Sequence, residues 1–412
     1  MKKFFLLLFL SVTICTFSQT DTGDLEAYLG NIITNMPGDS GDNYKEPTAG
    51  ELSTWEDCIN ALFGGFLATA RTHADAVNYR IVEYINTGLG SNTGLYYVLE
   101  EKTPQSNYWG TYVFAQGTTR GLVLQAPHSR FDFNTGKEAI YSFVRLHPLG
   151  LFLNGTHRCN HNTASTCSGT TTVCGCGGSD PFKISDMAHN TNTVWQKTTE
   201  LTLATFSNAV FVQLHGFTKL STDPYVILSN GTDQTPTSID YAVQIKDELF
   251  NQDATLTFKI AHLDSWTRLV GFTNTQGRFI NQSANPCNTA ATSTTGRFIH
   301  IEQEKSKLRE DATGWEKMFQ ALNTVFTSTL SNNDVDKVTV LSEIPFKNSF
   351  SFSAESVKQI TVFNLLGKTV YHQKNRRNQI AFTLDTSKYP SGVYILQLDT
   401  EQGVIRKKIL RE

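Results

Sequence analysis

The sequence predicts two folded parts in series, an α/β domain followed by a small all-β sandwich. From Thr111 to about residue 330, short apolar runs of strand length alternate with stretches that have helical spacing of apolar residues. From Phe350 to Glu412 the pattern becomes alternating and strand-like, and turn residues interrupt it. A polar segment at 331–345 is expected to link the two parts.

The first 19 residues have the parts of a secretory signal peptide. A basic start, Met1-Lys-Lys, precedes an apolar run from Phe4 to Ile14, and cleavage is expected before residue 20. The apolar run is too short to span a bilayer comfortably, and no later stretch is apolar enough for a transmembrane helix. The mature chain is therefore expected to be exported and to lack a transmembrane segment.

Charge and cysteine content narrow the functional classes. The formal net charge of −3 gives no reason to expect binding to nucleic acid. An even number of cysteines follows the signal peptide, which in an exported protein favours disulfides over thiolate metal sites. Their pairing cannot be deduced from the sequence alone. These cysteines are Cys58, Cys159, Cys167, Cys174, Cys176 and Cys287.

Residues 20–105 carry no recognisable chemistry, and their role is left open. A loose segment rich in Gly, Asp, Asn and Pro runs to Gly50. A capping box at Ser53–Glu56 predicts the start of an apolar helix that continues through Ala70. Leu95–Glu100 is predicted to be a strand.

Residues 106–330 are predicted to form the α/β domain. Its first clear strand, Leu122–Ala126, must stop at Pro127, because proline cannot continue a central strand. A capping box at Thr135–Glu138 then predicts the start of a helix. The remaining predicted strands are Leu149–Leu153, Ala209–Leu214, Tyr225–Leu228, Thr255–Ile260 and Arg297–Ile301, and the remaining helices end near Leu203, Phe250 and Thr329.

Polar side chains follow several of these strands. In open α/β sheets the carboxyl ends of the strands are where ligands bind. A lone histidine after a strand is more often structural. Packing alone, however, does not require a polar side chain to follow one strand after another, so the repetition favours a functional site. A zinc hydrolase site consists of three protein ligands, a water, and a carboxylate that takes the proton of that water. The polar residues in question are His128 with Asp132, His157 with Arg158, His215, and Glu302.

The last residues, 346–412, resemble the C-terminal sorting domain of the type IX secretion system of Bacteroidetes. The resemblance implies that the type IX secretion machinery recognises this domain and carries the chain across the outer membrane. It also implies removal of the domain and release of the protein or its attachment at the cell surface. The matching blocks are Phe363–Val370, Leu384–Ser387, Pro390–Tyr394, Gly403 and the pair Lys407 and Lys408.

The order of polar residues in 106–330 resembles that of zinc carboxypeptidase-like hydrolases, a group that includes aspartoacylase-like and N-formylglutamate amidohydrolase-like enzymes. The resemblance implies a mixed sheet flanked by helices and one zinc ion held by His128, Asp132 and His215. It also implies that Glu302 is the general base. The usual spacing is His-x-x-Glu, whereas this chain has His-x-x-x-Asp. His189 is therefore an alternative ligand.

The expected function is that of a secreted zinc-dependent hydrolase that cleaves an amide or peptide bond in a small molecule or peptide. Arg158 is expected to take part in catalysis and to bind a substrate carboxylate in bidentate fashion. His157, Arg278 and Arg309 are further candidates for substrate binding. The alternative is a non-catalytic surface adhesin or glycan-binding protein that is exported by the same route. The identity of the substrate, the oligomeric state and the choice between release and anchoring are left open.

Overall fold

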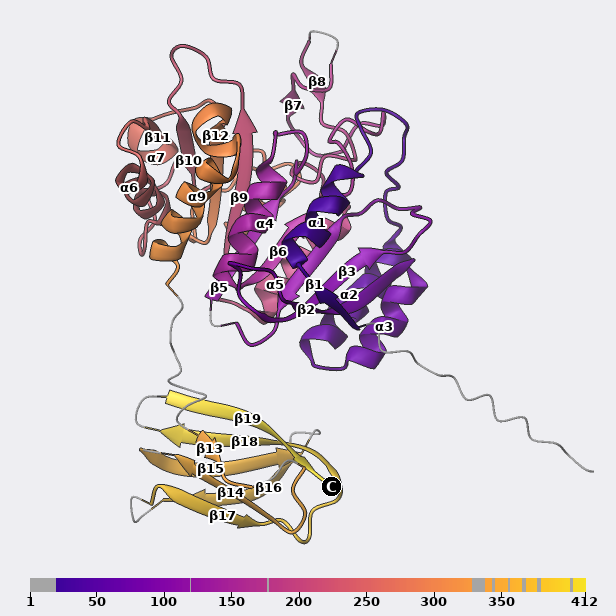
Figure 1. Cartoon of the computed structure of the whole chain (residues 1–412), viewed down its shortest axis with the longest axis vertical. Helices are drawn as coiled ribbons and strands as arrows, with labels where there is room; N and C mark the ends of the chain where they lie inside the picture. The colour runs from indigo at the N-terminus through magenta and orange to yellow at the C-terminus, as the bar shows by residue number, and fades with distance from the viewer. Residues whose placement is uncertain are drawn as a thin grey trace, which may run out of the picture. The chain divides into compact units, whose positions relative to one another are not determined.

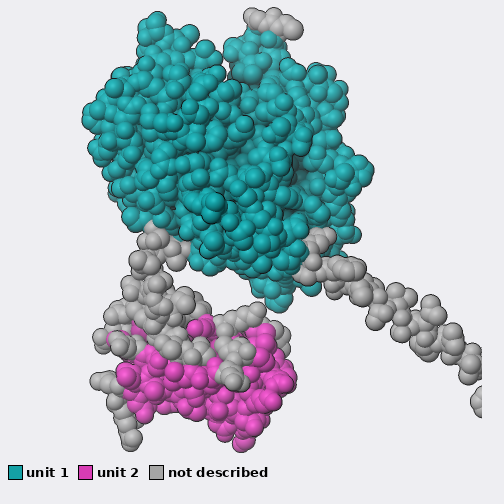
Figure 2. Space-filling view, in the orientation of Figure 1, with its two compact units in different colours: residues 1–327 teal, residues 328–412 magenta. Residues whose placement is uncertain are grey.

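The computed structural model describes the chain as two compact units, residues 1–327 and 328–412 (Figure 2). The predicted signal peptide lies outside the described residues, as do 331–337 of the predicted linker. The described residues are 20–118, 120–175, 178–327, 338–342, 345–354, 356–364, 368–375, 379–400 and 403–412.

The described part of the first unit contains one large mixed sheet, as predicted (Figure 1). Its strands run in the order β1-β2-β3-β4-β6-β5-β9-β12-β10-β11, and β6, β5, β9 and β12 are parallel neighbours. Strands β1 to β3 come from residues 20–105, so this region belongs to the same sheet. The strands are β1 Thr20–Gly23, β2 Tyr79–Asn86, β3 Gly94–Glu101, β4 Thr111–Ala115, β5 Arg120–Ala126, β6 Pro148–Leu153, β9 Val210–Phe217, β10 Val226–Ser229, β11 Phe258–Ile260 and β12 Phe298–Glu304.

Helices cover both faces of the sheet, and each face has its own apolar core. This arrangement explains why the central strands are nearly continuous apolar runs, because both of their faces are buried. One face is packed against α1 (Leu25–Thr34), α4 (Thr135–Leu146), α6 (Tyr241–Gln252) and α9 (Ala312–Val325). The other is packed against α2 (Ala49–Phe63), α3 (Leu67–Ala76), α5 (Val194–Thr205) and α8 (Thr275–Ile280). Shorter elements are β7 (Thr170–Thr171), β8 (Asp180–Pro181), α7 (Ala261–Asp264) and the π-helical turn η1 (Lys305–Arg309).

Two predicted capping boxes are wrong. Helix α2 is capped by Thr48, whose side chain and Glu51 form the capping box, so the helix begins before Ser53–Glu56. Helix α4 begins after Asn134, which has a φ of 64° and makes no side-chain cap. Glu138 lies in the first turn of α4, where its side chain is fully buried. A pattern of residue types cannot tell a capping glutamate from a buried one, because that depends on how the helix packs.

The parallel pairing of β9 and β12 aligns the polar residues near their ends. Gln213 pairs with His300 and His215 pairs with Glu302. Because side chains alternate along a strand, all four point to the face covered by α5 and α8, whereas Leu214 joins the opposite core. The same face of β5 carries Gln125, which pairs with Gln213.

The second unit is all β, as predicted. Its two antiparallel sheets run β13-β14-β17 and β16-β15-β18-β19, and apolar residues of both sheets share one core. Residues 365–367, which the sequence pattern included in a β segment, lie outside the described residues. The strands are β13 Val338–Val340, β14 Ser349–Ala354, β15 Val357–Asn364, β16 Thr369–Lys374, β17 Ala381–Asp385, β18 Gly392–Thr400 and β19 Gly403–Arg411.

Two disulfides hold the loop that follows β6, Cys159–Cys174 and Cys167–Cys287. The first closes the loop on itself, and the second ties it to the segment before β12. Cys58 is free and buried, and Cys176 lies outside the described residues. Within the described ranges, helices of the length and apolarity needed to cross a bilayer do not occur.

Candidate metal centre

His128, Asp132 and His215 converge at the carboxyl end of the central strands. His128 lies in the turn after β5, Asp132 lies just before α4, and His215 lies in β9. Oδ2 of Asp132 is 3.1 Å from Nδ1 of His128 and 3.4 Å from Nδ1 of His215. All three side chains are buried, and their ligand atoms lie within 4.8 Å of one another. The structure therefore brings together the three expected metal ligands.

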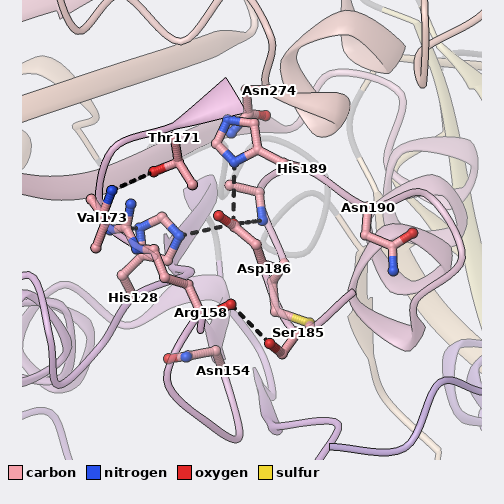
Figure 3. Close-up of polar contacts among 12 residues, drawn as sticks. His128, Asn154, Arg158, Thr171, Val173, Ser185, Asp186, His189, Asn190 and Asn274 are labelled. Atoms are coloured by element: carbon pink, nitrogen blue, oxygen red, sulfur yellow. Dashed lines mark hydrogen bonds and ion pairs between the residues drawn. The ribbon is translucent and has the colours of Figure 1, made fainter. Parts of the chain in front are cut away.

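Asp186 fixes the orientation of His128 from the far side of the imidazole ring (Figure 3). Its Oδ1 is 3.0 Å from Nε2 of His128 and also accepts the main-chain N–H of Ala188. Burial opposes ionisation of Asp186, but His189 and His128 outweigh it and keep the pKa of the carboxyl well below its usual range. Because an ionised carboxylate only accepts, Nε2 of His128 carries a proton and Nδ1 is directed at Asp132. Metal-binding histidines are held in this way by carboxylates.

The electrostatics of the centre favour an ionised aspartate between two imidazoles. Burial opposes ionisation of Asp132, but Arg158 and His128 outweigh it and hold the pKa of the carboxyl well below its usual range. Burial lowers the pKa of His215 to about 4. Burial and Arg158 also lower the pKa of His128, yet Asp132 and Asp186 together raise it above its ordinary value. Asp132 and Asp186 thus place negative charge beside the two imidazoles, part of which Arg158 compensates.

Arg158 supplies positive charge to the same point. Its guanidinium donates to Oδ1 of Asp132 and contacts Nδ1 of His128. Arg158 directly precedes the disulfide-bonded Cys159, and its carbonyl accepts a hydrogen bond from Oγ of Ser185 at 2.8 Å (Figure 3). The loop that carries Arg158 is thus held covalently and by hydrogen bonds.

His157 lies beside the centre and does not contact the three ligands. Its Nδ1 accepts the main-chain N–H of Cys159 at 2.9 Å, and its ring packs edge-on against Phe131 at 4.0 Å between centroids. Burial lowers the pKa of His157 to about 4, so the ring is neutral near pH 7. His157 can therefore contribute an apolar edge or a neutral donor, but not charge.

Glu302 lies next to His215 in the sheet. Its Oε1 is 3.8 Å from Nε2 of His300, and its Oε2 is buried without a hydrogen-bond partner in the described part of the chain. Burial and the charge of Asp132 raise the pKa of Glu302 to about 8. The rings of His215 and His300 stack at 4.2 Å, and these two residues form a second group of potential ligands with Glu302.

Among the described residues, Asp186 links His189 to the centre. Nδ1 of His189 is 3.2 Å from Oδ1 of Asp186 (Figure 3). The ring of His189 stacks on Phe182 at 3.6 Å between centroids. It belongs to neither of the two groups of potential ligands found among the described residues. The structure thus places this alternative ligand behind Asp186.

Arg278 and Arg309 lie in the packing around the centre. Arg309 donates to main-chain carbonyls of Phe133, Phe217 and Gln303. Arg278 donates to those of Phe272, Pro286 and Cys287 and to Oγ of Ser168. Both guanidinium groups therefore hold loops in place. Arg309 donates through Nε, Nη1 and Nη2, whereas the bonds of Arg278 are made by Nε and Nη1.

Gln213 is a residue of the site that sequence reasoning missed. Its Oε1 is 3.1 Å from Nε2 of His215, and its side chain is fully buried. One signal was available in the sequence. Gln213 interrupts the apolar run of β9 at a position that alternation turns toward the interior, and so does Gln125 in β5.

The donor set fits a zinc ion. Two imidazole nitrogens and one carboxylate oxygen are ligands that zinc takes in catalytic sites, where the fourth position is left for water or substrate. The neighbouring oxygen of Glu302 has no hydrogen-bond partner among the described residues. A bound water or substrate group at the open position would provide that partner.

Comparison with known proteins identifies the second unit. Residues 344–412 match the family described as the secretion system C-terminal sorting domain. This confirms the predicted resemblance, and it indicates export by the type IX secretion system to the cell surface or the extracellular space. No curated protein matches the chain.

Solved structures show weak similarity. A protein assigned as a carboxypeptidase A from Shewanella denitrificans OS-217 is 10% identical with a TM-score of 0.30, over 61% of this chain and 67% of that chain. A metallo-carboxypeptidase from Burkholderia cenocepacia is 9% identical with a TM-score of 0.28, over 67% of this chain and 69% of that chain. Similarity at this level does not by itself identify an activity.

Proposed function

We propose that this chain is an exported zinc-dependent hydrolase that cleaves an amide or peptide bond. The observation that carries the proposal is the convergence of three buried ligand atoms, Nδ1 of His128, Nδ1 of His215 and Oδ2 of Asp132. Glu302 lies beside this group and keeps a carboxylate oxygen that lacks a protein partner among the described residues. The proposed hydrolase region lies within 20–330, the linker is 331–345, and the sorting domain is 346–412.

Each residue has a defined part in the proposed reaction. Zinc, when bound, would polarise the carbonyl of the substrate and acidify a water. Glu302 is suited to hold the proton that this water gives up and to pass it to the leaving amine. The positive charge of Arg158 is suited to orient the carbonyl or a carboxylate of the substrate. Asp186 and Gln213 hold the two histidines.

The protonation state of Glu302 depends on the centre. Its pKa of about 8 favours the neutral acid near pH 7 when its environment is the one described here. A nearby cation favours the charged form of a carboxyl group, so a metal ion at the centre opposes the effect of burial. Near pH 7, Glu302 is therefore expected to ionise, and to become a base, when the metal is bound.

The first test is metal content. The purified protein without residues 1–19 should contain about one zinc ion per chain. His128→Ala and His215→Ala should each lose it. His262→Ala is the matched control, because His262 also pairs with an aspartate, the partly exposed Asp240, at 2.8 Å but lies outside the groups of potential ligands found among the described residues. Equally low metal in the wild type and in all three variants would refute the proposal.

The second test concerns the reaction. Glu302→Gln should keep the zinc and lose about 10²- to 10⁴-fold in kcat on a panel of blocked dipeptides and N-acyl amino acids. Wild-type protein that binds zinc but hydrolyses no member of a broad panel would favour the alternative, a non-catalytic surface protein.

A further inference from the structure

A cluster of buried side-chain amides lies next to His215 on the sheet face covered by α5 and α8. Its central member is Gln213 on β9, which bonds Gln125 on β5 and both Gln276 and Asn274 at the start of α8. All four side chains have an exposed fraction of 1% or less. Buried amides are costly unless their donors and acceptors are matched, so their orientations are constrained.

The carbonyl of Met187 provides one fixed point. A main-chain carbonyl can only accept, and Nε2 of Gln276 lies 2.9 Å from it. The NH₂ group of Gln276 must therefore face Met187, which turns its Oε1 toward Gln213. Nε2 of Gln213 donates to that oxygen at 3.0 Å.

A second fixed point lies on the other side of Gln213. The hydroxyl of Thr199 donates to the carbonyl of Trp195 at 3.0 Å, so it accepts from Nε2 of Gln125 at 2.9 Å. Oε1 of Gln125 then accepts from Nε2 of Gln213 at 2.8 Å. This independent chain of bonds requires the same orientation of Gln213.

A third fixed point acts on the oxygen of Gln213. The main-chain N–H of Gly277 donates to Oδ1 of Asn274 at 2.8 Å, because Asn274 caps α8. The NH₂ group of Asn274 therefore faces Gln213 and donates to its Oε1 at 2.7 Å. Three main-chain groups, the carbonyls of Met187 and Trp195 and the N–H of Gly277, thus require the same orientation of Gln213. Its Nε2 faces two oxygens, and its Oε1 faces His215.

The consequence for His215 follows from the 3.1 Å contact between its Nε2 and Oε1 of Gln213. A carboxamide oxygen only accepts, so this ring nitrogen must carry a proton. In a neutral imidazole the other nitrogen, Nδ1, then carries the lone pair, and it is directed at Oδ2 of Asp132. Asp132 competes for the proton of His215, because its carboxylate would accept a hydrogen from Nδ1.

We propose that Gln213 is a positioning residue that holds neutral His215 as the Nε2–H tautomer, with the lone pair of Nδ1 directed at the candidate metal centre. Without Gln213, the carboxylate of Asp132 draws the imidazole proton of His215 to Nδ1. A cation that binds through Nδ1 must then displace this proton. The consequence for metal binding rests on the proposed function, whereas the tautomer is a property of the metal-free protein.

The tautomer can be measured directly by long-range ¹H–¹⁵N correlation spectra of the metal-free, exported form with ¹⁵N-labelled histidine. The chain has ten histidines, and the signals of His215 are those that His215→Gln removes. At about pH 8, where ordinary imidazoles are neutral, the wild type should show the Nε2–H pattern. An Nδ1–H pattern in the wild type would overturn the proposal without any variant of Gln213.

Two substitutions separate positioning from packing. Gln213→Leu should shift His215 to the Nδ1–H pattern. Gln125→Met removes another buried amide of the same cluster, but Gln276 still orients Gln213, so the Nε2–H pattern should persist. A folded Gln213→Leu protein that keeps the Nε2–H pattern would overturn the proposal.

Zinc affinity, measured by competition with a chelator, provides the second readout. Gln213→Leu should weaken binding about 10- to 100-fold, which is typical when a group that orients a ligand is lost, whereas Gln125→Met should leave it nearly unchanged. Equal zinc affinity in the wild type and in Gln213→Leu, together with unchanged tautomers, would overturn the role of Gln213 and leave the hydrolase proposal intact. Absence of zinc binding in the wild type with the Nε2–H pattern would refute the hydrolase proposal and support the tautomer assignment.

Discussion

Replacing Glu138 by glutamine should make the first unit more stable near neutral pH. Glu138 is fully buried, accepts one hydrogen bond from Nε2 of Gln303 at 2.7 Å, and keeps its other oxygen without a partner among the described residues. Burial raises its pKa from 4.5 to about 8. The group is therefore protonated in the folded protein and ionised in the unfolded chain at intermediate pH. Glutamine keeps an oxygen for Gln303 and cannot ionise.

The sign and size of the effect follow from proton linkage. Between the two pKa values the folded state binds one more proton than the unfolded state, so the stability of the wild type falls as pH rises through this range. Relative to Glu138→Gln, the free energy of unfolding should fall by about 1.4 kcal/mol per pH unit, or about 4 kcal/mol between about pH 5 and about pH 8. Below about pH 4.5 the difference should be constant.

Urea unfolding followed by tryptophan fluorescence can measure this difference. All five tryptophans lie in the first unit, so their emission does not report unfolding of the sorting domain. The free energies of unfolding of the wild type and of Glu138→Gln should be compared at several pH values. The contributions of the other titrating groups are the same in both proteins and cancel in the difference. A difference that stays constant from about pH 5 to about pH 8 would show that Glu138 is ionised in the folded state, and it would refute the reasoning.

Three further substitutions test other parts of the structure. Gly216→Ala should destabilise the first unit by about 1–3 kcal/mol, because the added Cβ would lie 2.2 Å from the guanidinium carbon of the firmly bonded Arg309; an unchanged urea midpoint would contradict this. Gly30→Ala should instead stabilise it by up to about 1 kcal/mol, since Gly30 lies inside α1 and its Cβ would meet open space; a lower midpoint would count against that assignment. Asp186→Ala should weaken zinc binding about 10- to 100-fold by removing the acceptor that orients His128, and chelator competition that finds wild-type affinity would exclude this role.

The fold could be predicted from the sequence where local pattern determines structure. Apolar runs of strand length predicted β5, β6, β9, β10 and β12, because buried parallel strands require such runs. Helix starts were less predictable. Ser53–Glu56 has the residue types of a capping box, but the chain caps α2 five residues earlier with Thr48 and Glu51.

The candidate site was predictable in its members and not in their detailed contacts. His128, Asp132 and His215 stand out because each follows or ends an apolar strand, and the structure brings them together. The carboxylate that holds His128 lies 58 residues further along the chain, in a loop without regular pattern. Likewise, nothing in the sequence around Arg309 shows that its guanidinium is used by main-chain carbonyls, because those contacts depend on loops that are distant in the chain.

The pairing of β9 with β12 makes the site sensitive to how these two strands align. A slip of one residue would turn His215 and Glu302 toward opposite faces of the sheet and would bury charge in the apolar layer under α4 and α9. A single insertion or deletion inside either strand would separate the acid from the ligand. Variation in length among related chains should therefore concentrate in the loops between Phe217 and Phe298, outside β10, β11 and α8.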